Sequence, residues 1–92
     1  MPVYITNGTI IDVSNERDTF FITVNYIECQ QCQQIEQTVR LNVTPCTVIL
    51  NRNNMPIPAN RLRTGMTINA AFSPIMTRSL PPQANAFEIQ VV

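Results

Sequence analysis

Two cysteines separated by two residues are the side chains in this sequence best suited to chemistry. Cys29 and Cys32 lie in the segment ECQQCQQ, and Cys46 is the only other cysteine. Thiolates bind zinc, but a closed structural zinc site needs four ligands, and the chain contains no histidine. A carboxylate, a water molecule or a neighbouring chain would have to complete the site. Zinc at Cys29, Cys32 and Cys46 is therefore an alternative, and the leading prediction includes no cofactor.

The same C-x-x-C pair could instead act as a redox centre. Redox pairs of the thioredoxin type lie at the N-terminus of a helix, where the helix dipole favours the thiolate. Here the pair lies in a glutamine-rich stretch between two segments that alternate like strands. We therefore predict a polar turn between two strands, and keep a thiolate metal-binding or redox module as the first alternative function.

Conventional catalytic groups are scarce in this chain. It contains no histidine and no lysine, and its two glycines, Gly8 and Gly65, are too far apart for a glycine-rich phosphate loop. No nucleophile elbow or metalloprotease motif is present. Asp12 and Glu88 lie in predicted strands, where we expect them on the solvent face. We predict that the protein is not an enzyme and has no catalytic residue.

The charges balance but are distributed unevenly. Six arginines and six acidic residues give zero net charge, which argues against a general binder of nucleic acids or membrane surfaces. Residues 1–46 carry two arginines against five acidic residues, whereas residues 47–92 carry four arginines against one. Either the two halves interleave in one barrel and their charges mix on its surface, or complementary faces favour self-association.

Alternation of apolar and polar residues with a period of two dominates the chain and predicts strands. The expected strands cover residues 8–13, 19–27, 35–43, 46–50, 66–72 and 86–92. In the first of them we expect Ile11 and Val13 to share a face. In the last we expect Phe87, Ile89 and Val91 to face inward.

The connections between these strands show no signal for a helix longer than about one turn. The polar segment 14–18 has the length of a hairpin loop, Pro58 can open a helical turn through Leu62, and Gly65 can end it with a positive φ. A small all-β domain must protect its edges, and closure into a barrel does so. We predict a single β-barrel domain over residues 1–92, all-β and OB-like, with five to six strands and at most one short helical turn. A two-sheet sandwich is the alternative.

The order of these elements resembles that of OB-like barrels, with five strands and a small helix between the third and the fourth. Residues 47–49, T-V-I, precede residues 62–68, L-R-T-G-M-T-I. This is similar to small bacterial OB-like domains of unassigned function, in which a T-V-I strand precedes an L-x-x-G-M-x-I segment. The resemblance spans most of the chain from Gly8 on. It implies a fold, and no functional residue is carried over from it.

OB-like barrels often bind single-stranded nucleic acid through aromatic and basic side chains on one face. The aromatic residues in predicted strands that could serve are Phe20, Phe21, Tyr26 and Phe72. The arginines that could line a groove are Arg40, Arg52, Arg61, Arg63 and Arg78. Because the net charge is zero and there is no lysine, nucleic-acid binding is the second alternative function, and we do not expect nucleic acid as a partner.

The proline-rich segment 73–85 carries apolar residues outside the alternation. Ile75, Met76 and Leu80, with Arg78 among them, could cover the open end of the barrel or form an adhesive patch for a partner. Together with the uneven charges and the scarcity of catalytic groups, they predict a non-catalytic interaction or assembly module. Such a module would self-associate or bind a protein partner.

No apolar run approaches the about 20 residues of a membrane helix, so we expect no contact with a membrane. Residues 1–8 lack the basic region and the apolar core of a signal peptide. These two features predict a cytoplasmic location.

Overall fold

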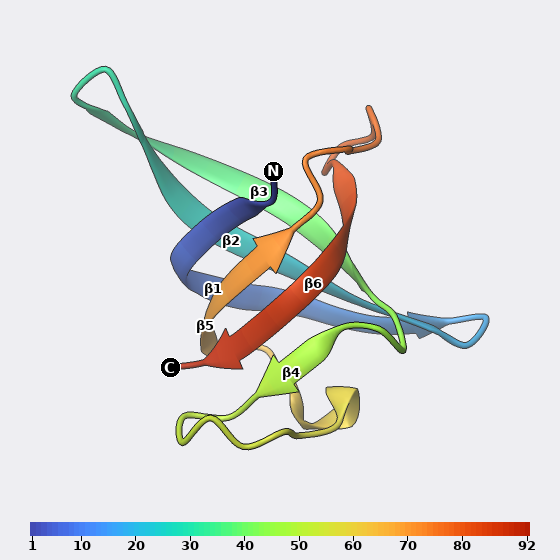
Figure 1. Ribbon diagram of the computed structural model, residues 1–92. Coiled ribbons are helices and arrows are strands. Elements are labelled where there is room, and N and C mark those ends of the chain that lie inside the picture. The colour runs from blue at the N-terminus through green and yellow to red at the C-terminus, as the bar shows by residue number, and fades with distance from the viewer.

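The computed structural model describes residues 1–92 as six strands and one short helical turn (Figure 1). The elements are β1 (Val3–Glu16), β2 (Thr19–Gln30), β3 (Gln33–Val43), β4 (Val48–Leu50), η1 (Ala59–Arg61), β5 (Thr67–Phe72) and β6 (Gln83–Val91). The strands follow the order β3-β2-β1-β5-β6-β4, and a further pairing of β3 with β6 closes five of them into a barrel. β4 is the extra strand and pairs in parallel with β6. The predicted fold class, a small all-β barrel with one helical turn, is confirmed.

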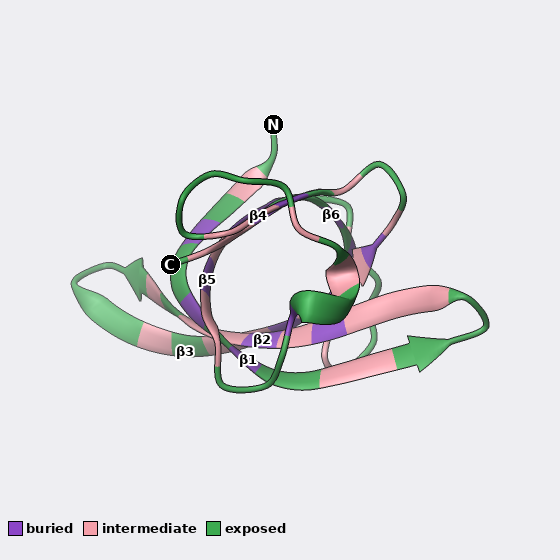
Figure 2. Ribbon diagram, turned by 90° about the horizontal axis from the view of Figure 1, so that it is seen from below, coloured by how far each residue is buried: buried purple, intermediate pink, exposed green.

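The core lies inside the closed ring of strands. Figure 2 looks along the barrel and shows the buried residues distributed around this ring. The largest fully buried side chains are Phe72, Ile10, Ile22, Leu41, Ile68, Ile89, Val24 and Val39. They come from β1, β2, β3, β5 and β6, so every strand of the ring contributes to one apolar cluster. The alternation predicted for β2, β3 and β5 accounts for most of this core.

Two-residue turns connect the first three strands. Arg17 and Asp18 both have positive φ, and so do Gln31 and Cys32. Positive φ at both central positions defines a type I′ turn, whose twist matches that of the flanking strands. The loop predicted over residues 14–18 is therefore too long, because β1 and β2 stay paired up to the turn.

A β-bulge in β1 overturns one prediction about facing. The register with β2 shifts between Ile10 and Asp12, which makes Ile11 the extra residue. An extra residue reverses the alternation on either side of it. Ile10 is consequently buried and Ile11 is 47% exposed, whereas Val13 packs against the core. The prediction that Ile11 and Val13 share a face is therefore wrong.

A second bulge changes the facing of Phe87 in β6. Ala71 pairs with Glu88 and Phe72 pairs with Ala86, so Phe87 has no partner in β5. The prediction that Phe87 faces inward is wrong, since its side chain is 49% exposed and Ala86 takes the buried position.

β1 is long enough to pair with two different strands, β5 along its first half and β2 along its second half. The strand bends at Asn7, which has a positive φ and whose backbone N–H donates to Asn69 Oδ1 at 3.0 Å. Gly8 lies at the bend, where an added Cβ would come 2.7 Å from Cγ1 of Val24. The predicted first strand began at Gly8, so its first half was missed.

β3 and β4 lie end to end along one edge of β6, both parallel to it. Pro45 lies in the turn that separates them. After this turn, Thr47 Oγ1 donates to the backbone carbonyl of Ala86 at 2.7 Å. β6 therefore holds β5 at one edge and both β3 and β4 at the other.

The connection after β4 contains the predicted helical turn. Pro58 precedes the residues Ala59–Arg61, and Leu62 ends the turn and is buried in the core. Gly65 has the predicted positive φ, and its N–H donates to the carbonyl of Ile10 at 2.8 Å. The structure contains no helix with the length and apolar character needed to cross a membrane.

Candidate functional site

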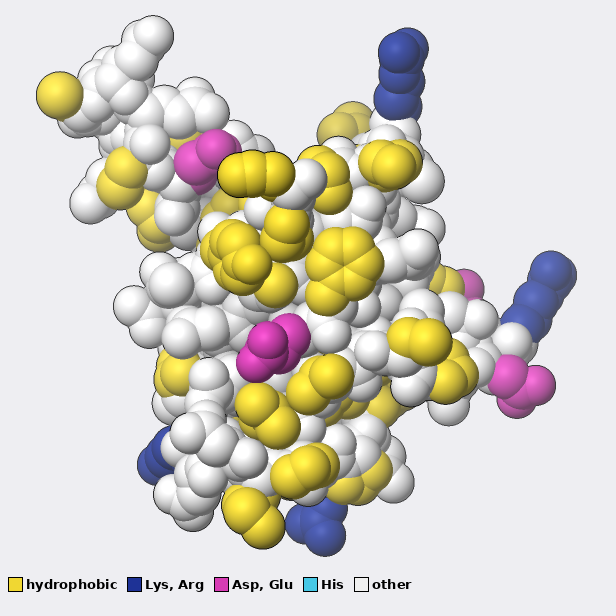
Figure 3. Space-filling view, viewed as in Figure 1, with side chains coloured by type: hydrophobic (Ala, Val, Ile, Leu, Met, Phe, Trp, Pro, Cys, Tyr) yellow, Lys and Arg dark blue, Asp and Glu magenta, His cyan; other side chains and the backbone are white.

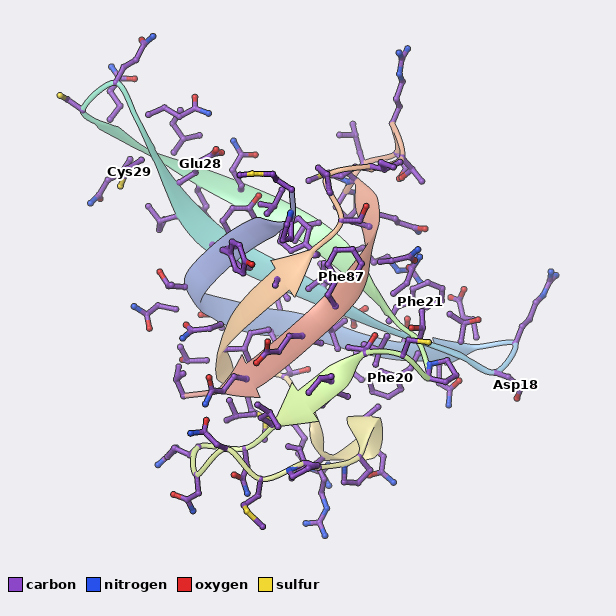
Figure 4. All side chains as sticks on the ribbon, viewed as in Figure 1. Asp18, Phe20, Phe21, Glu28, Cys29 and Phe87 are labelled. Carbon is purple, nitrogen blue, oxygen red and sulfur yellow. The ribbon has the colours of Figure 1, made fainter.

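The C-x-x-C pair lies at the tip of the β2–β3 hairpin, which projects from the barrel (Figure 4). Cys29 is opposite Gln34 in the strands and Cys32 lies in the turn, so the prediction of a polar turn is confirmed. Cys46 follows the other end of β3, and all three thiols are exposed and free. Along the 11 residues of β3, about 35 Å of strand separates Cys32 from Cys46.

The structure therefore does not bring Cys29, Cys32 and Cys46 together within one chain. No group of three or more histidine, cysteine, aspartate or glutamate side chains is placed to hold a metal ion. A zinc site completed by a second chain stays a prediction.

The Arg40 side chain already has partners within its own chain. Its guanidinium lies 4.1 Å from the ring centre of Phe21, and its Nη2 lies 3.6 Å from Oε1 of Glu16. Nη2 also donates to Oγ of Ser14 at 3.2 Å. These contacts join β1, β2 and β3 on the outer face of the barrel, so Arg40 and Phe21 stabilise the fold and are not free for a ligand.

Three other arginines gather at one end of the barrel, beside the helical turn η1. Arg52, Arg61 and Arg63 line an open groove of ≈ 620 Å³, which we call the arginine groove. Its complete lining is Asn51, Arg52, Pro56, Ile57, Pro58, Arg61, Arg63, Met66 and Val91. No acidic and no aromatic residue lines it, and none of its arginines forms an ion pair. The predicted combination of aromatic and basic residues in one groove is therefore not assembled here.

The proline-rich loop between β5 and β6 divides its apolar residues between two roles. Met76 is partly buried and packs against the core, as a cover for the end of the barrel would. Leu80 is 97% exposed, and Ile75 and Arg78 are exposed too. The loop is fixed to the start of β6, because Thr77 Oγ1 accepts the N–H of Gln83 at 3.0 Å.

An apolar patch lies on the outer face of the barrel over β1, β5, β6 and β4. A row of directly paired residues crosses the four strands: Tyr4, Ala71, Glu88 and Val48. Tyr4 is 73% exposed, and Val48 is exposed at the other end of the row. The bulged Phe87 precedes Glu88 and projects from the same face (Figure 4). We call Tyr4, Val48 and Phe87 the outer patch.

A hollow lies beside Tyr4 at one end of the outer patch. Between Tyr4 and Glu88 the small side chain of Ala71 leaves this hollow of ≈ 230 Å³. Figure 3 shows hydrophobic side chains gathered on this face of the molecule. The loop with Ile75 and Leu80 starts beside it, because the Ser73 N–H donates to the carbonyl of Asn85 in β6 at 2.9 Å.

Sequence reasoning missed both aromatic residues of the outer patch. Phe87 was expected in the core, and Tyr4 preceded the first predicted strand. The alternation of Val3, Tyr4, Ile5 and Thr6 was a usable signal, since it places Tyr4 on the face opposite to the buried Ile5. Nothing comparable marked Phe87, because its exposure depends on the bulge.

Burial, and secondly the negative charge of Glu28, raise the pKa of Tyr26 above its usual value of 10.0. The two residues lie two positions apart on β2 and therefore share a face of the strand. A raised pKa in the folded state means that the neutral phenol is favoured by folding. This stabilisation is fully present at pH values below the pKa that Tyr26 has in the unfolded chain. It is lost as the pH rises through the higher pKa that Tyr26 has in the folded protein.

Glu28→Gln is expected to lower the pKa of Tyr26 only part of the way to 10.0, because burial is the larger cause of the shift. The ultraviolet absorbance of tyrosinate during an alkaline titration measures it. A Tyr4→Phe background removes the signal of the only other tyrosine. A full return to the ordinary value would contradict the assignment to burial.

The comparisons with known proteins give no further information on the site. No protein-family model, no curated protein and no solved structure matches the chain.

Proposed function

We propose that this chain is a non-catalytic assembly module that binds a second copy of itself through the outer patch. The observation that carries the proposal is the row across four strands, which presents Tyr4 and Val48 to solvent, with the bulged Phe87 exposed beside it. A hollow adjoins the patch at Tyr4. Full burial of one large apolar side chain is worth about 1.5–3 kcal/mol. A partner that covers the patch would gain this for several side chains at once.

The way Phe87 is displayed supports a binding role. A β-bulge changes the direction of a side chain. Here it directs the aromatic ring of Phe87 outward, directly after the buried Ala86. An aromatic side chain fixed on a strand loses little entropy on binding, and such residues are enriched among those that dominate interfaces. Tyr4, paired in register at the edge of the hollow, is of the same kind.

The charges beside the outer patch favour a second copy over an unrelated protein. Glu88 lies within the row and Arg78 lies in the adjoining loop, and neither forms an ion pair in the chain. In a two-fold contact the same surface is used by both subunits. If one residue of the first subunit contacts a different residue of the second, the reverse contact forms as well. Glu88 would then pair with Arg78 of the partner subunit, twice per dimer.

The residues that line the hollow support a non-catalytic role. Glu88 is the only titratable group besides Tyr4 that lines it, and the other polar lining residues are the uncharged Thr6, Asn69 and Gln90. General acid–base chemistry uses a proton donor and a proton acceptor aimed at the same reacting atom. A single carboxylate among uncharged side chains suits recognition better.

Phe87→Ser is expected to weaken self-association by at least about tenfold, because it removes an aromatic contact that a two-fold interface uses twice. Ile11→Ser is the matched control, since Ile11 is 47% exposed and Phe87 49%, and both are bulged residues outside the core. Sedimentation velocity from micromolar to millimolar concentration measures both variants and the wild type. A wild type that stays monomeric over this range would refute the proposal, as would equal effects of the two substitutions.

A further inference from the structure

The distal part of the β2–β3 hairpin is an acidic arm that pairs with no other strand of the barrel, although Tyr26 at its base packs against the core. The last pair between β1 and β2 is Thr9 with Asn25, so from Tyr26 to Gln37 the two strands pair only with each other. Figure 1 shows this segment leaving the barrel at the end opposite to η1. We call residues 26–37 the arm. It carries Glu28 and Glu36 and no basic residue.

The arm has the features of a docking element. A two-stranded ribbon is only marginally stable alone in water, and both of its outer edges offer unpaired backbone groups. Its Ile27 side chain is exposed. Glu36 accepts a hydrogen bond from Asn25 Nδ2 at 2.7 Å, and neither Glu28 nor Glu36 has a cationic partner in its own chain.

The arginine groove is the complement of the arm in charge and in polarity. Arg52, Arg61 and Arg63 surround it, no carboxylate lines it, and Ile57 is among its apolar lining residues. It lies at the η1 end of the barrel, away from the arm. Within one chain the two surfaces therefore do not meet, and the positive charge of the groove stays uncompensated.

We propose that the arm of one copy docks in the arginine groove of the next. Glu36 would accept hydrogen bonds from the guanidinium groups, which form forked contacts with carboxylates. Ile27 is the cross-strand partner of Glu36 and lies on the same face of the ribbon, whereas Glu28 lies on the opposite face and adds to the negative charge of the arm. Ile27 would cover the apolar lining. The inference goes beyond the proposed function, because it uses surfaces other than the outer patch and does not require it.

A second copy fits the groove better than single-stranded nucleic acid does. Sites for single strands combine basic residues with aromatic side chains on which the bases stack, and no aromatic residue lines this groove. The arm supplies the opposite charge within the same sequence. Because the two surfaces differ, the contact is head-to-tail, and it continues into a chain of subunits or closes into a ring.

Two variants test the two sides of this contact, the arm and the arginine groove, one at a time. Both carry Phe87→Ser as well, so that association through the outer patch is weakened. Glu28→Gln with Glu36→Gln disables the arm, and Arg61→Gln with Arg63→Gln disables the groove. Each is expected to lower head-to-tail association by about tenfold. Asp12→Asn with Asp18→Asn removes the same charge from exposed positions elsewhere and should change nothing. The association should also weaken as salt screens the charges.

Mixing the two variants is the decisive experiment. The groove variant retains an intact arm and the arm variant retains an intact groove, so a one-to-one mixture should form a dimer that cannot extend. Sedimentation velocity should detect this dimer only in the mixture. The absence of a mixed dimer, or a parent protein whose association ignores salt, would overturn the inference. Binding of an oligothymidylate that is lost in the groove variant would assign the groove to nucleic acid and overturn it too.

Discussion

Phe72→Ala is expected to destabilise the domain by about 3–5 kcal/mol, a large share of its stability. Phe72 is fully buried at the end of β5 and is the largest side chain of the core. Truncation of a buried phenylalanine to alanine costs about 3–5 kcal/mol, and a domain of this kind is stable by only about 5–15 kcal/mol. Urea unfolding followed by circular dichroism measures the loss.

Phe87→Ala is the matched control for this prediction. It removes the same atoms from a side chain that is about half exposed and lies outside the core. Its effect on stability should be under about 1 kcal/mol, since exposed positions tolerate substitution. Equal losses for the two variants would mean that Phe87, and not only Phe72, is buried in solution.

Gly8→Val is expected to destabilise the barrel by about 1–3 kcal/mol, the usual cost of overpacking. Even the first added carbon would lie 2.7 Å from Cγ1 of Val24. Val24 is fully buried and its branched side chain has few rotamers, so it cannot move aside without displacing its neighbours. The shift in the midpoint of urea unfolding measures this cost, when the dependence of the unfolding free energy on urea concentration is the same for both proteins.

A double-mutant cycle tests the cause of that loss. In a Val24→Ala background the added side chain has room, so Gly8→Val should cost markedly less there than in the wild type. Gly65 provides the contrast, because nothing lies within 4 Å of an added Cβ and only its φ of +95° opposes substitution. Gly65→Ala should therefore cost the same in both backgrounds. An unchanged cost of Gly8→Val would exclude the clash with Val24.

Alternation and single turn residues in the sequence predicted the elements that are defined by a few consecutive residues. The alternation through Ile22 and Val24 marked β2, and Pro58 marked the start of the helical turn. Gly65 has the expected positive φ but does not end that turn, because Leu62 ends it and Gly65 lies in a separate turn that follows. The bulge at Ile11 could not be predicted in the same way. A bulge is a property of a pair of strands, and the sequence of one strand alone does not determine its register with the partner strand.

The surfaces were harder to predict than the fold. Ile75 and Leu80 could be named from the loop sequence, because apolar residues in a proline-rich segment have no strand face to occupy. The arginine groove needed the structure, since Arg52 and Arg63 are brought together by the turn at η1 and not by periodicity. The outer patch depends on cross-strand register, which places Tyr4 in one row with Glu88.

The position of β6 between three other strands has a consequence for synthesis. The β1–β2 and β2–β3 hairpins can form as soon as they leave the ribosome, because their contacts are local. Residues 83–91 supply the second partner of β3 and of β5, and the only partner strand of β4. Until those residues emerge, the nascent chain exposes strand edges and the apolar inner face of an open sheet, both of which promote mispairing. We therefore expect chaperones to be needed mainly in the interval between the appearance of β3 and that of β6.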